Sequence, residues 1–414
     1  MTTQRPADAA QSATESHDAP GHAVEPDARM TADFVPAAAV RPEVFVSRAG
    51  DHIQRGLQRG RELRTGIGAA IAGYQRYFAH LGITEVDARH AADDSYARLQ
   101  AWAPEAAAEI SAVAEGSGRT VTEIMEVIAR TEIMTLAKAA PTECSTVTRV
   151  VPGATVSAQT WDWLADFSTL WHIGDVGAVP GQLRHVGIAE YGMLGKIGLN
   201  EAGVGVHLNI LKHADDRAGG VPVHAVLDRV LSTAHTLTEA VEIIRSAPTS
   251  SSSVITVVTA EAAVQVEIAG EAKRELRPGD PAGTGDARPA DTEAALAEAD
   301  VLLHTNHFLH PDLQTGAMEL RADSSSRPRY DFLAARTAAA IAAGNPPETT
   351  ADLVALLTSG PGDPPVSCTP EPGAAYGDRP ATLVTVQIDP GAKTIELAPG
   401  SPADGLHGNR RFQL

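Results

Sequence analysis

The sequence predicts an α+β fold in which antiparallel sheets are layered with helices. Two observations predict it. Residues from Val44 to Ala140 are patterned as helices, whereas most of the later chain alternates apolar and polar side chains as β-strands do. Several strand-like runs are also joined in pairs by short turns rich in Gly and Pro, which is typical of hairpins and therefore of antiparallel pairing.

The composition indicates one large domain behind a tail. The chain has 414 residues, of which 43% are apolar, enough to build a sizeable core. Residues 1–40 are rich in Ala, Pro, Asp, Thr and Ser and have few large apolar side chains, so we expect them to be disordered. The remaining segment, 41–414, is predicted to be a single catalytic domain. Met30 is a second candidate for the start of translation.

The charge and the cysteine content narrow the class of partner. Lys and Arg total 33 against 52 Asp and Glu, a net charge of -19, which argues against nucleic acid or an anionic membrane as a partner. Two cysteines cannot form a disulfide framework, and no run of 18 apolar residues is present. We therefore expect a reduced, cytoplasmic protein. No Gly-x-Gly-x-x-Gly motif is present, and neither a cofactor nor a metal is expected.

In the helical part, the clearest signals are one helix end and one helix start. The run 106–114 is followed by Gly116 and Gly118, which favour termination of a helix. Thr120 and Glu123 then form a potential capping box in front of a helix predicted over 124–136. At least two helices therefore precede the strands.

The later elements are predicted from period and from turn residues. A Gly, Pro and Asp rich insertion is expected from residue 271 to about 298. The predicted strands are 145–151, 155–163, 183–189, 192–198, 204–210, 254–259, 263–268, 301–309, 381–388 and 394–398. The predicted helices are 222–231, 237–246, 330–343 and 350–358.

Cys144 is the residue that bears most on function. It stands at the start of the first predicted hairpin, whose loop is expected to be Pro152, Gly153 and Ala154. With that loop, Cys144 would lie directly opposite Asp162, at about 4.5 to 5.5 Å between Cβ atoms. A thiol beside a carboxylate contributes little to stability, but a nucleophile needs a polar neighbour of this kind.

A carboxylate beside a thiol raises the pKa of the thiol, so a cation or an amine must compensate. Cleavage of the peptide bond before Cys144 would supply one, because the new α-amino group, with a pKa of about 8, could act as the base for its own thiol. Asp162 would orient that amine, and the amide N–H of Asn306 could stabilise a tetrahedral oxyanion. The alternative is that Cys144 is a buried structural cysteine.

The histidines at 304, 307 and 310 form a second group. On a helix this spacing could hold zinc. The surrounding apolar residues instead favour a strand, in which residues three apart point to opposite faces. We therefore expect His307 to support the site through a hydrogen bond and His310 to lie at the surface. Glu267, inside a predicted strand, is expected either at a rim or as a paired buried carboxylate.

At these positions the chain resembles the acyl-coenzyme A:6-aminopenicillanic-acid acyltransferase family, which comprises N-terminal-nucleophile hydrolases of the isopenicillin N acyltransferase type. The resemblance spans roughly residues 44 to 400 and is specific because several short motifs occur in the same order. The motifs are 113–118, 129–132, Cys144-Ser145-Thr146, Gln159-Thr160-Trp161-Asp162-Trp163, 198–203, His304-Thr305-Asn306-His307-Phe308-Leu309 and Ser324-Ser325-Ser326-Arg327.

The resemblance implies a four-layered αββα sandwich and a precursor that cleaves itself into an α chain, 1–143, and a β chain, 144–414. It also implies roles for four residues. By motif, Cys144 would be the nucleophile, Asp162 the neighbour of the new amine, Asn306 the oxyanion donor and Arg327 an electrostatic support. One hydroxyl of the serine run 250–253 would serve processing or the pocket.

The expected substrate is a small amide or thioester, with acyl-coenzyme A as a candidate donor and water or an amine as the acceptor. One feature departs from the family. A small residue such as Gly usually precedes the nucleophile, whereas Glu143 stands there in this chain. Gly tolerates the strained backbone that self-cleavage requires more easily. The alternative is an unprocessed binding or scaffolding protein of the same fold.

Overall fold

The computed structural model describes residues 34–137, 144–280, 290–319, 321 and 323–414. They belong to one compact unit that begins at Phe34. Phe34 packs against the core and Val40 is buried, so the packed part of the chain starts before the predicted domain boundary at residue 41. The rest of the predicted tail, Met30 and Glu143 lie outside the described residues.

The N-terminal part forms a bundle of helices. Its helices are α1 (His52–Glu62), α2 (Arg64–His80), α3 (Glu85–Trp102), α4 (Pro104–Ser117), α5 (Val121–Ile128) and α6 (Arg130–Met134). The predicted capping box is confirmed, because Thr120 and Glu123 exchange both hydrogen bonds at the start of α5. Gly118 ends α4 with a φ of 69°, a conformation that glycine adopts without strain.

The described strands form an eight-stranded and a six-stranded sheet. The first sheet has the order β1 (Val44–Val46), β4 (Trp171–Val176), β5 (His185–Glu190), β6 (Ile197–Asn200), β7 (Gly205–Ile210), β8 (Ser253–Val258), β9 (Ala263–Ala269) and β10 (Ala272–Leu276). The second has the order β11 (Val301–His304), β2 (Ser145–Arg149), β3 (Val156–Leu164), β12 (Pro380–Asp389), β13 (Thr394–Pro399) and β14 (Arg410–Gln413).

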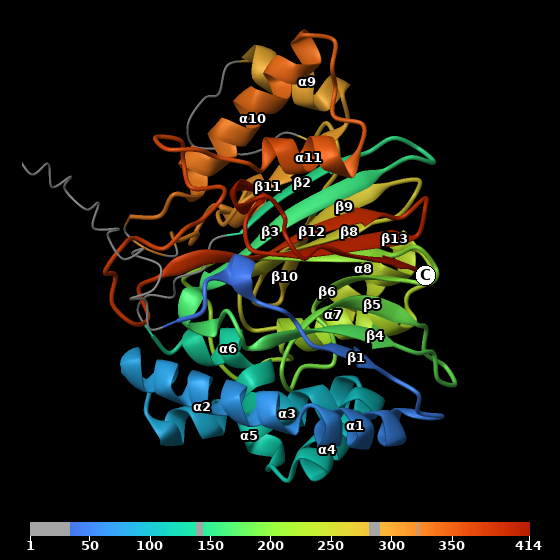
Figure 1. The fold of residues 1–414 in the computed structure, drawn as a ribbon, viewed down its shortest axis with the longest axis vertical. Helices are drawn as coiled ribbons and strands as arrows, with labels where there is room; N and C mark the ends of the chain where they lie inside the picture. The colour runs from blue at the N-terminus through green and yellow to red at the C-terminus, as the bar shows by residue number, and fades with distance from the viewer. Residues whose placement is uncertain (1–33, 138–143, 281–289, 320, 322) are drawn as a thin grey trace, which may run out of the picture. The chain divides into compact units, whose positions relative to one another are not determined.

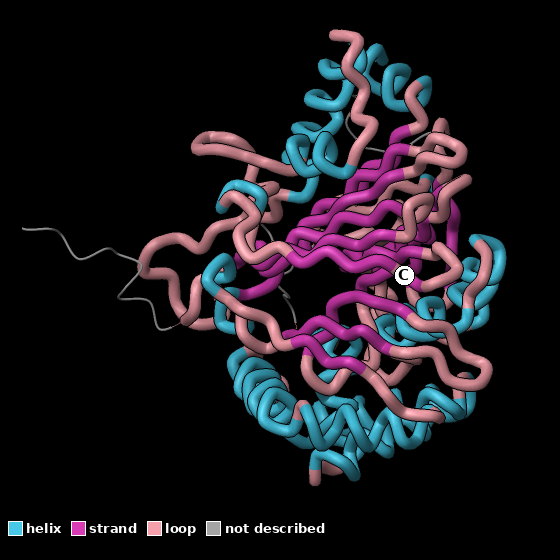
Figure 2. The backbone as a smooth tube through the Cα atoms, turned by 45° about the vertical axis from the view of Figure 1, so that its right-hand side comes forward, coloured by secondary structure: helices cyan, strands magenta, loops and turns pink. Residues whose placement is uncertain are grey.

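The two sheets pack on each other and helices cover their outer faces, which makes a four-layered αββα sandwich (Figure 1). The helices on the first sheet are α7 (Val223–Thr233) and α8 (Leu237–Ser246), and those on the second are α9 (Ala290–Glu298), α10 (Ser326–Ala342) and α11 (Thr350–Leu356). Figure 2 shows the strands of the two sheets lying between groups of helices. All nine residues of β3 are buried because this strand has a covering layer on each face. The predicted fold class is therefore confirmed.

The hairpin that carries Cys144 has a different register from the predicted one. Ser145 pairs with Thr160, and the connection between the strands is residues 150–155 rather than three residues. The turn is longer because its backbone bonds elsewhere: the Gly153 N–H donates to the carbonyl of Ala260 in another hairpin. The predicted three-residue loop is therefore wrong.

The corrected register changes what lies opposite the cysteine. Continued by one residue, it places Trp161 opposite Cys144, so the predicted direct pairing of Cys144 with Asp162 is wrong. Side chains alternate faces along a strand, and a shift of one residue therefore exchanges a carboxylate for an indole. Asp162 still approaches the thiol, but through its backbone carbonyl.

Three other strand assignments also need correction. Residues 44–46 form β1, which pairs in parallel with β4, and are not helical. In the run 192–198 only Ile197 and Gly198 are in a strand, and the run 301–309 leaves its strand after His304. The strands β4, β10 and β14 were not predicted. β4 carries little alternation, and β10 lies within the predicted insertion.

Within the part of the chain that the structure describes, no helix combines the length and the apolar character needed to cross a membrane.

Candidate active site

Cys144 lies directly before β2, and three side chains from distant segments hold its backbone. Its N–H donates to Asn306 Oδ1 at 2.8 Å. Its carbonyl accepts from Asn209 Nδ2 at 3.0 Å and from Arg329 Nη1 at 2.9 Å. Main-chain groups at a strand end usually bond to other main-chain groups or to water. Here side chains fix both polar groups of a residue that is only 3% exposed.

The thiol lies in surroundings that disfavour its charged form. Cys144 Sγ is 3.8 Å from the backbone oxygen of Asp162. Burial, and secondly the charge of the Asp162 carboxylate, raise the pKa of Cys144 to about 12. The positive charges of Lys196 and Arg329 act in the opposite direction. The thiol therefore needs a base or additional positive charge before it can act as a nucleophile.

Asp162 is buried on β3 and is positioned by a neighbouring strand. Thr382 Oγ1, on β12, donates to Asp162 Oδ1 at 2.6 Å. The same hydroxyl accepts from the backbone N–H of Cys368 at 2.9 Å, and the Thr382 N–H donates to the Cys368 carbonyl. The second cysteine of the chain thus supports the site through its backbone, whereas its thiol has no role in these contacts.

Asn306 follows β11 and joins Cys144 to two other segments. Its Oδ1 accepts from Cys144 and from Arg329 Nη2, the latter at 2.8 Å. Its Nδ2 donates to the carbonyl of Ile210 at 2.9 Å, at the end of β7. A carboxamide carries two N–H donors, so this contact leaves one for a substrate oxygen. The structure therefore brings Cys144, Asp162 and Asn306 together.

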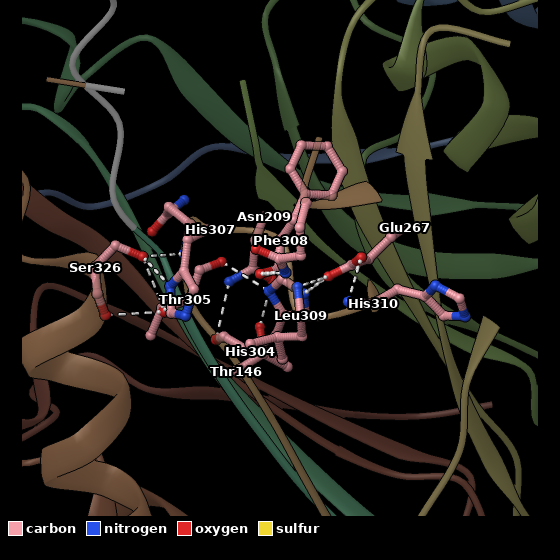
Figure 3. A network of polar contacts seen from close by, with 12 residues as sticks. Thr146, Asn209, Glu267, His304, Thr305, His307, Phe308, Leu309, His310 and Ser326 are labelled. Carbon is pink, nitrogen blue, oxygen red and sulfur yellow. Dashed lines mark hydrogen bonds and ion pairs between the residues drawn. The ribbon is translucent and has the colours of Figure 1, made fainter. Parts of the chain in front are cut away.

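The hydroxyl of Ser326 supports the backbone of Asn306. It accepts from the Asn306 N–H at 2.8 Å and lies 2.8 Å from His307 Nδ1 (Figure 3). Thr305 Oγ1 contacts the same serine. The hydrogen bond expected of His307 is therefore present, and Ser326 connects it to the backbone of Asn306.

Arg329, not Arg327, reaches Cys144. Arg329 is fully buried and donates to Cys144, Asn306 and Ser145 Oγ. Arg327 is 36% exposed and pairs with Glu319 at 3.0 Å. Two residues apart on a helix are about 200° apart around its axis, so the two arginines of α10 point to opposite sides. The motif alone had directed the assignment to Arg327.

Glu267 and His304 form a buried pair behind the loop that carries Asn306. His304 Nε2 lies 2.9 Å from Glu267 Oε1, and neither side chain is exposed. The same carboxylate accepts from the N–H groups of Leu309 and His310, at 2.6 and 3.0 Å (Figure 3). Glu267 is therefore a paired buried carboxylate. Among the described residues, no group of three or more His, Cys, Asp or Glu side chains is arranged to hold a metal ion.

Asn209 is a site residue that the sequence analysis missed. Its Nδ2 donates to the carbonyl of Cys144 and also, at 3.2 Å, to that of His304. Thr146 Oγ1 and Gln159 Nε2 contact its Oδ1, so β7 of one sheet is bonded to β2 and β3 of the other (Figure 3). The available signal was a carboxamide near the end of a strand built mainly from Val, Leu and Ile.

A pocket of about 450 Å³ adjoins this site. Ile210, whose carbonyl holds Asn306, forms part of its wall. Of the serine run 250–253, Ser251 and Ser252 line the pocket; they donate to Glu132 Oε1 and Asp216 Oδ1 respectively. The apolar part of the lining consists mainly of Met134, Ile210, Leu211 and Met318.

The chain is similar to one protein family and to several solved structures. The profile of the acyl-coenzyme A:6-aminopenicillanic acid acyl-transferase family matches residues 152–404, more than half of the chain. Penicillin V acylase from Agrobacterium tumefaciens is 16% identical, with 62% of this chain and 83% of that chain covered and a TM-score of 0.38. Two variants of the conjugated bile acid hydrolase from Clostridium perfringens are each 12% identical, covering 65% of this chain and 92% of theirs, with TM-scores of 0.40. Comparison with curated protein sequences found no match.

Proposed function

Because the chain belongs to the acyl-coenzyme A:6-aminopenicillanic acid acyl-transferase family, we propose that it transfers or hydrolyses acyl groups through Cys144. Family membership supports acyl transfer or amide hydrolysis in general. The observation that supports Cys144 as the nucleophile is the convergence of Asn306, Asn209 and Arg329 on its two backbone polar groups. Such support is suited to a residue that must be held in place after its chain is cut.

The first step in this proposal is self-cleavage before Cys144, which yields chains 1–143 and 144–414. The sulfur attacks the preceding carbonyl carbon and the C–N bond breaks. The nitrogen takes up the proton that the thiol has lost, and a thioester forms. Water then hydrolyses the thioester and frees the thiol together with an α-amino group. Asn306 Oδ1, 2.8 Å from the Cys144 nitrogen, is placed to accept a hydrogen bond from that amine.

In the mature enzyme, the amine takes the thiol proton while the sulfur attacks the substrate carbonyl. The second N–H of Asn306 stabilises the oxyanion, a contribution of roughly 10²- to 10³-fold in rate for one donor. The ammonium then protonates the leaving group, and a thioester to Cys144 remains. Water or an amine accepts the acyl group from this thioester. Arg329 holds Cys144 and Asn306 in register, the supporting role that was first expected of Arg327.

The pocket beside Ile210 is the proposed place for the substrate. Its apolar walls suit a hydrocarbon portion of an amide or thioester, and its hydroxyls suit a polar end. The wall and the oxyanion donor are linked by one hydrogen bond, from Asn306 to Ile210. A substrate bound there would therefore have its carbonyl near the donor.

Replacement of each cysteine in turn tests self-cleavage. Wild-type protein is expected to give two chains, the second beginning at Cys144 by N-terminal sequencing. Cys144→Ala is expected to remain one chain. Cys368→Ala is the matched control, because the backbone N–H that Cys368 donates to Thr382 survives the substitution, and it is expected to be cut. An uncut wild-type chain, or a Cys144→Ala chain cut at the same bond, would favour the scaffolding alternative or an external protease.

A further inference from the structure

A cluster of buried charges lies beside the nucleophile. Lys196 Nζ is 2.9 Å from Glu190 Oε2, and the Arg130 guanidinium is 3.0 Å from the same oxygen. Tyr74 donates its hydroxyl to the other oxygen of Glu190. All three charged side chains are at most 2% exposed. Two cations share one carboxylate, so the trio carries one excess positive charge when Lys196 is protonated.

Lys196 and Arg130 each lie over an indole ring of β3, and Lys196 lies over the one opposite Cys144. Lys196 Nζ stands 3.6 Å from the centroid of the Trp161 ring. Trp161 is the residue that the register places opposite Cys144. An ammonium over an indole face is attracted by the ring. In the buried interior, the ring screens the charge of the ammonium from groups behind it less than water would. Lys196 reaches from the first sheet to the second at this point.

We propose that Lys196 supplies the positive charge that makes the Cys144 thiol reactive before the chain is cut. This inference rests on the proposed function, in which Cys144 is the nucleophile. Lys196 acts on Cys144 through its electric field. It does not bond to the substrate. Its role is greatest in the precursor, where the nitrogen of Cys144 is an uncharged amide and no α-amine exists.

The charges around the thiol support this role. Asp162 disfavours the thiolate, whereas Lys196 and Arg329 favour it. Arg329 is already engaged with Cys144 O, Ser145 and Asn306. The interaction is reciprocal, because a Cys144 thiolate raises the pKa of Lys196.

Other groups packed around Lys196 set its own charge. Burial lowers the pKa of Lys196 to about 7, while Glu190 opposes this shift and Arg130 adds to it. His224, on α7, contributes no charge near neutral pH because burial holds its pKa well below the usual value. Lys196 is therefore mostly protonated below about pH 7. A negative charge on the neighbouring sulfur raises the pKa of Lys196 and keeps it protonated to higher pH.

Replacement by Lys196→Met tests the inference in the full chain. Glu190 keeps Arg130 and Tyr74 as partners, so the variant leaves no orphaned charge. The rate of self-cleavage of the freshly synthesised chain, which reports the precursor, and the rate of iodoacetamide alkylation of Cys144, resolved from Cys368 by peptide mass spectrometry, are both measured against pH. The thiol pKa is expected to rise by about one unit, which lowers both rates near pH 7 about tenfold. Lys273→Met, which removes a lysine bonded to the carbonyl of Ala247, is the control and should match wild type.

A second measurement does not depend on the folding of a variant. The chain has only five lysines, so the Lys196 signal can be resolved by NMR of wild-type protein with ¹³C-labelled lysine. Carboxymethylation of Cys144 with iodoacetate places a fixed negative charge at the sulfur and should raise the pKa of Lys196, whereas the neutral carbamidomethyl group should leave this pKa unchanged. An unchanged lysine titration, or a Lys196→Met profile that overlays wild type, overturns the inference. A Cys144 that stays unreactive at every pH in wild type instead overturns the proposed nucleophile.

Discussion

At the scale of single residues, position on an element decides which of two similar side chains takes part in the site. In α10 the buried positions are 326, 329, 330, 333, 334 and 337, a spacing of three and four that defines one helix face. Arg329 lies on that face and Arg327 does not. Helical phase applied to the sequence would have separated the two arginines, whereas the motif by itself could not.

Replacement of these arginines should give opposite results. Arg329→Met removes the donor that aligns Cys144 and Asn306, and is expected to slow self-cleavage and turnover about 100-fold, since small misplacements cost that much. Arg327→Met loses only a partly exposed ion pair, worth about 0 to 1 kcal/mol, and should behave as wild type. The measurements are the cleavage rate by gel and hydrolysis of a chromogenic amide. Equal effects of both changes would contradict the assignment to Arg329.

Asn306→Ala should separate binding from chemistry. Loss of the oxyanion donor is expected to lower kcat by roughly 10²- to 10³-fold and to change KM little, because the ground-state carbonyl uses this N–H weakly. Steady-state kinetics on the mature enzyme measures the split. A change confined to KM would show that Asn306 binds substrate without stabilising the transition state.

At the scale of elements, local signals predicted the helices and hairpins but not their alignment. The capping box of α5, the bounds of α8 and the hairpin of β8 and β9 follow from nearby residues and agree with the structure. The register of β2 and β3 depends on a bond from Gly153 to Ala260, about a hundred residues away in sequence. Contacts of that kind leave no local pattern, so the register could not be predicted from nearby residues.

The loop after β11 should depend on the buried carboxylate behind it. Glu267→Ala leaves His304 and two backbone N–H groups without their acceptor, and is expected to cost about 3 to 5 kcal/mol of unfolding free energy. Glu271→Ala, which removes an exposed ion pair with Arg217, is the matched control and should cost under 1 kcal/mol. Urea unfolding followed by circular dichroism measures both values. A small loss for Glu267→Ala would show that the pair does not anchor this loop.

At the scale of the whole molecule, the αββα layers bring Cys144, Asn209, Asn306 and Arg329 to one place from four elements or their ends. The same layers bury ionisable groups. Burial lowers the pKa values of His172, His185 and His207 to about 3, and that of His224 well below its usual value. Burial also raises the pKa values of Glu132 and Asp228 to about 7.

These shifts predict that the protein loses stability in mild acid. Between about pH 6.5 and 4.5 the four histidines are protonated only when the chain unfolds, whereas the two carboxyl groups are protonated only when it is folded. The unfolded state thus binds about two more protons, and stability should fall by about 2.7 kcal/mol for each unit that the pH drops. His207→Leu removes one of these protons and should reduce the slope by about 1.4 kcal/mol per unit. Chemical denaturation across this pH range measures both slopes, and a flat profile would contradict the buried neutral histidines.

The most direct test of the central claim is the intact mass of the purified protein after brief exposure to a small activated acyl donor such as p-nitrophenyl acetate. We predict a fragment of residues 144–414 that carries one acyl group, located at Cys144 by peptide mapping and absent after treatment with hydroxylamine. A single uncut chain of 414 residues without an acyl group would contradict a self-processed cysteine nucleophile.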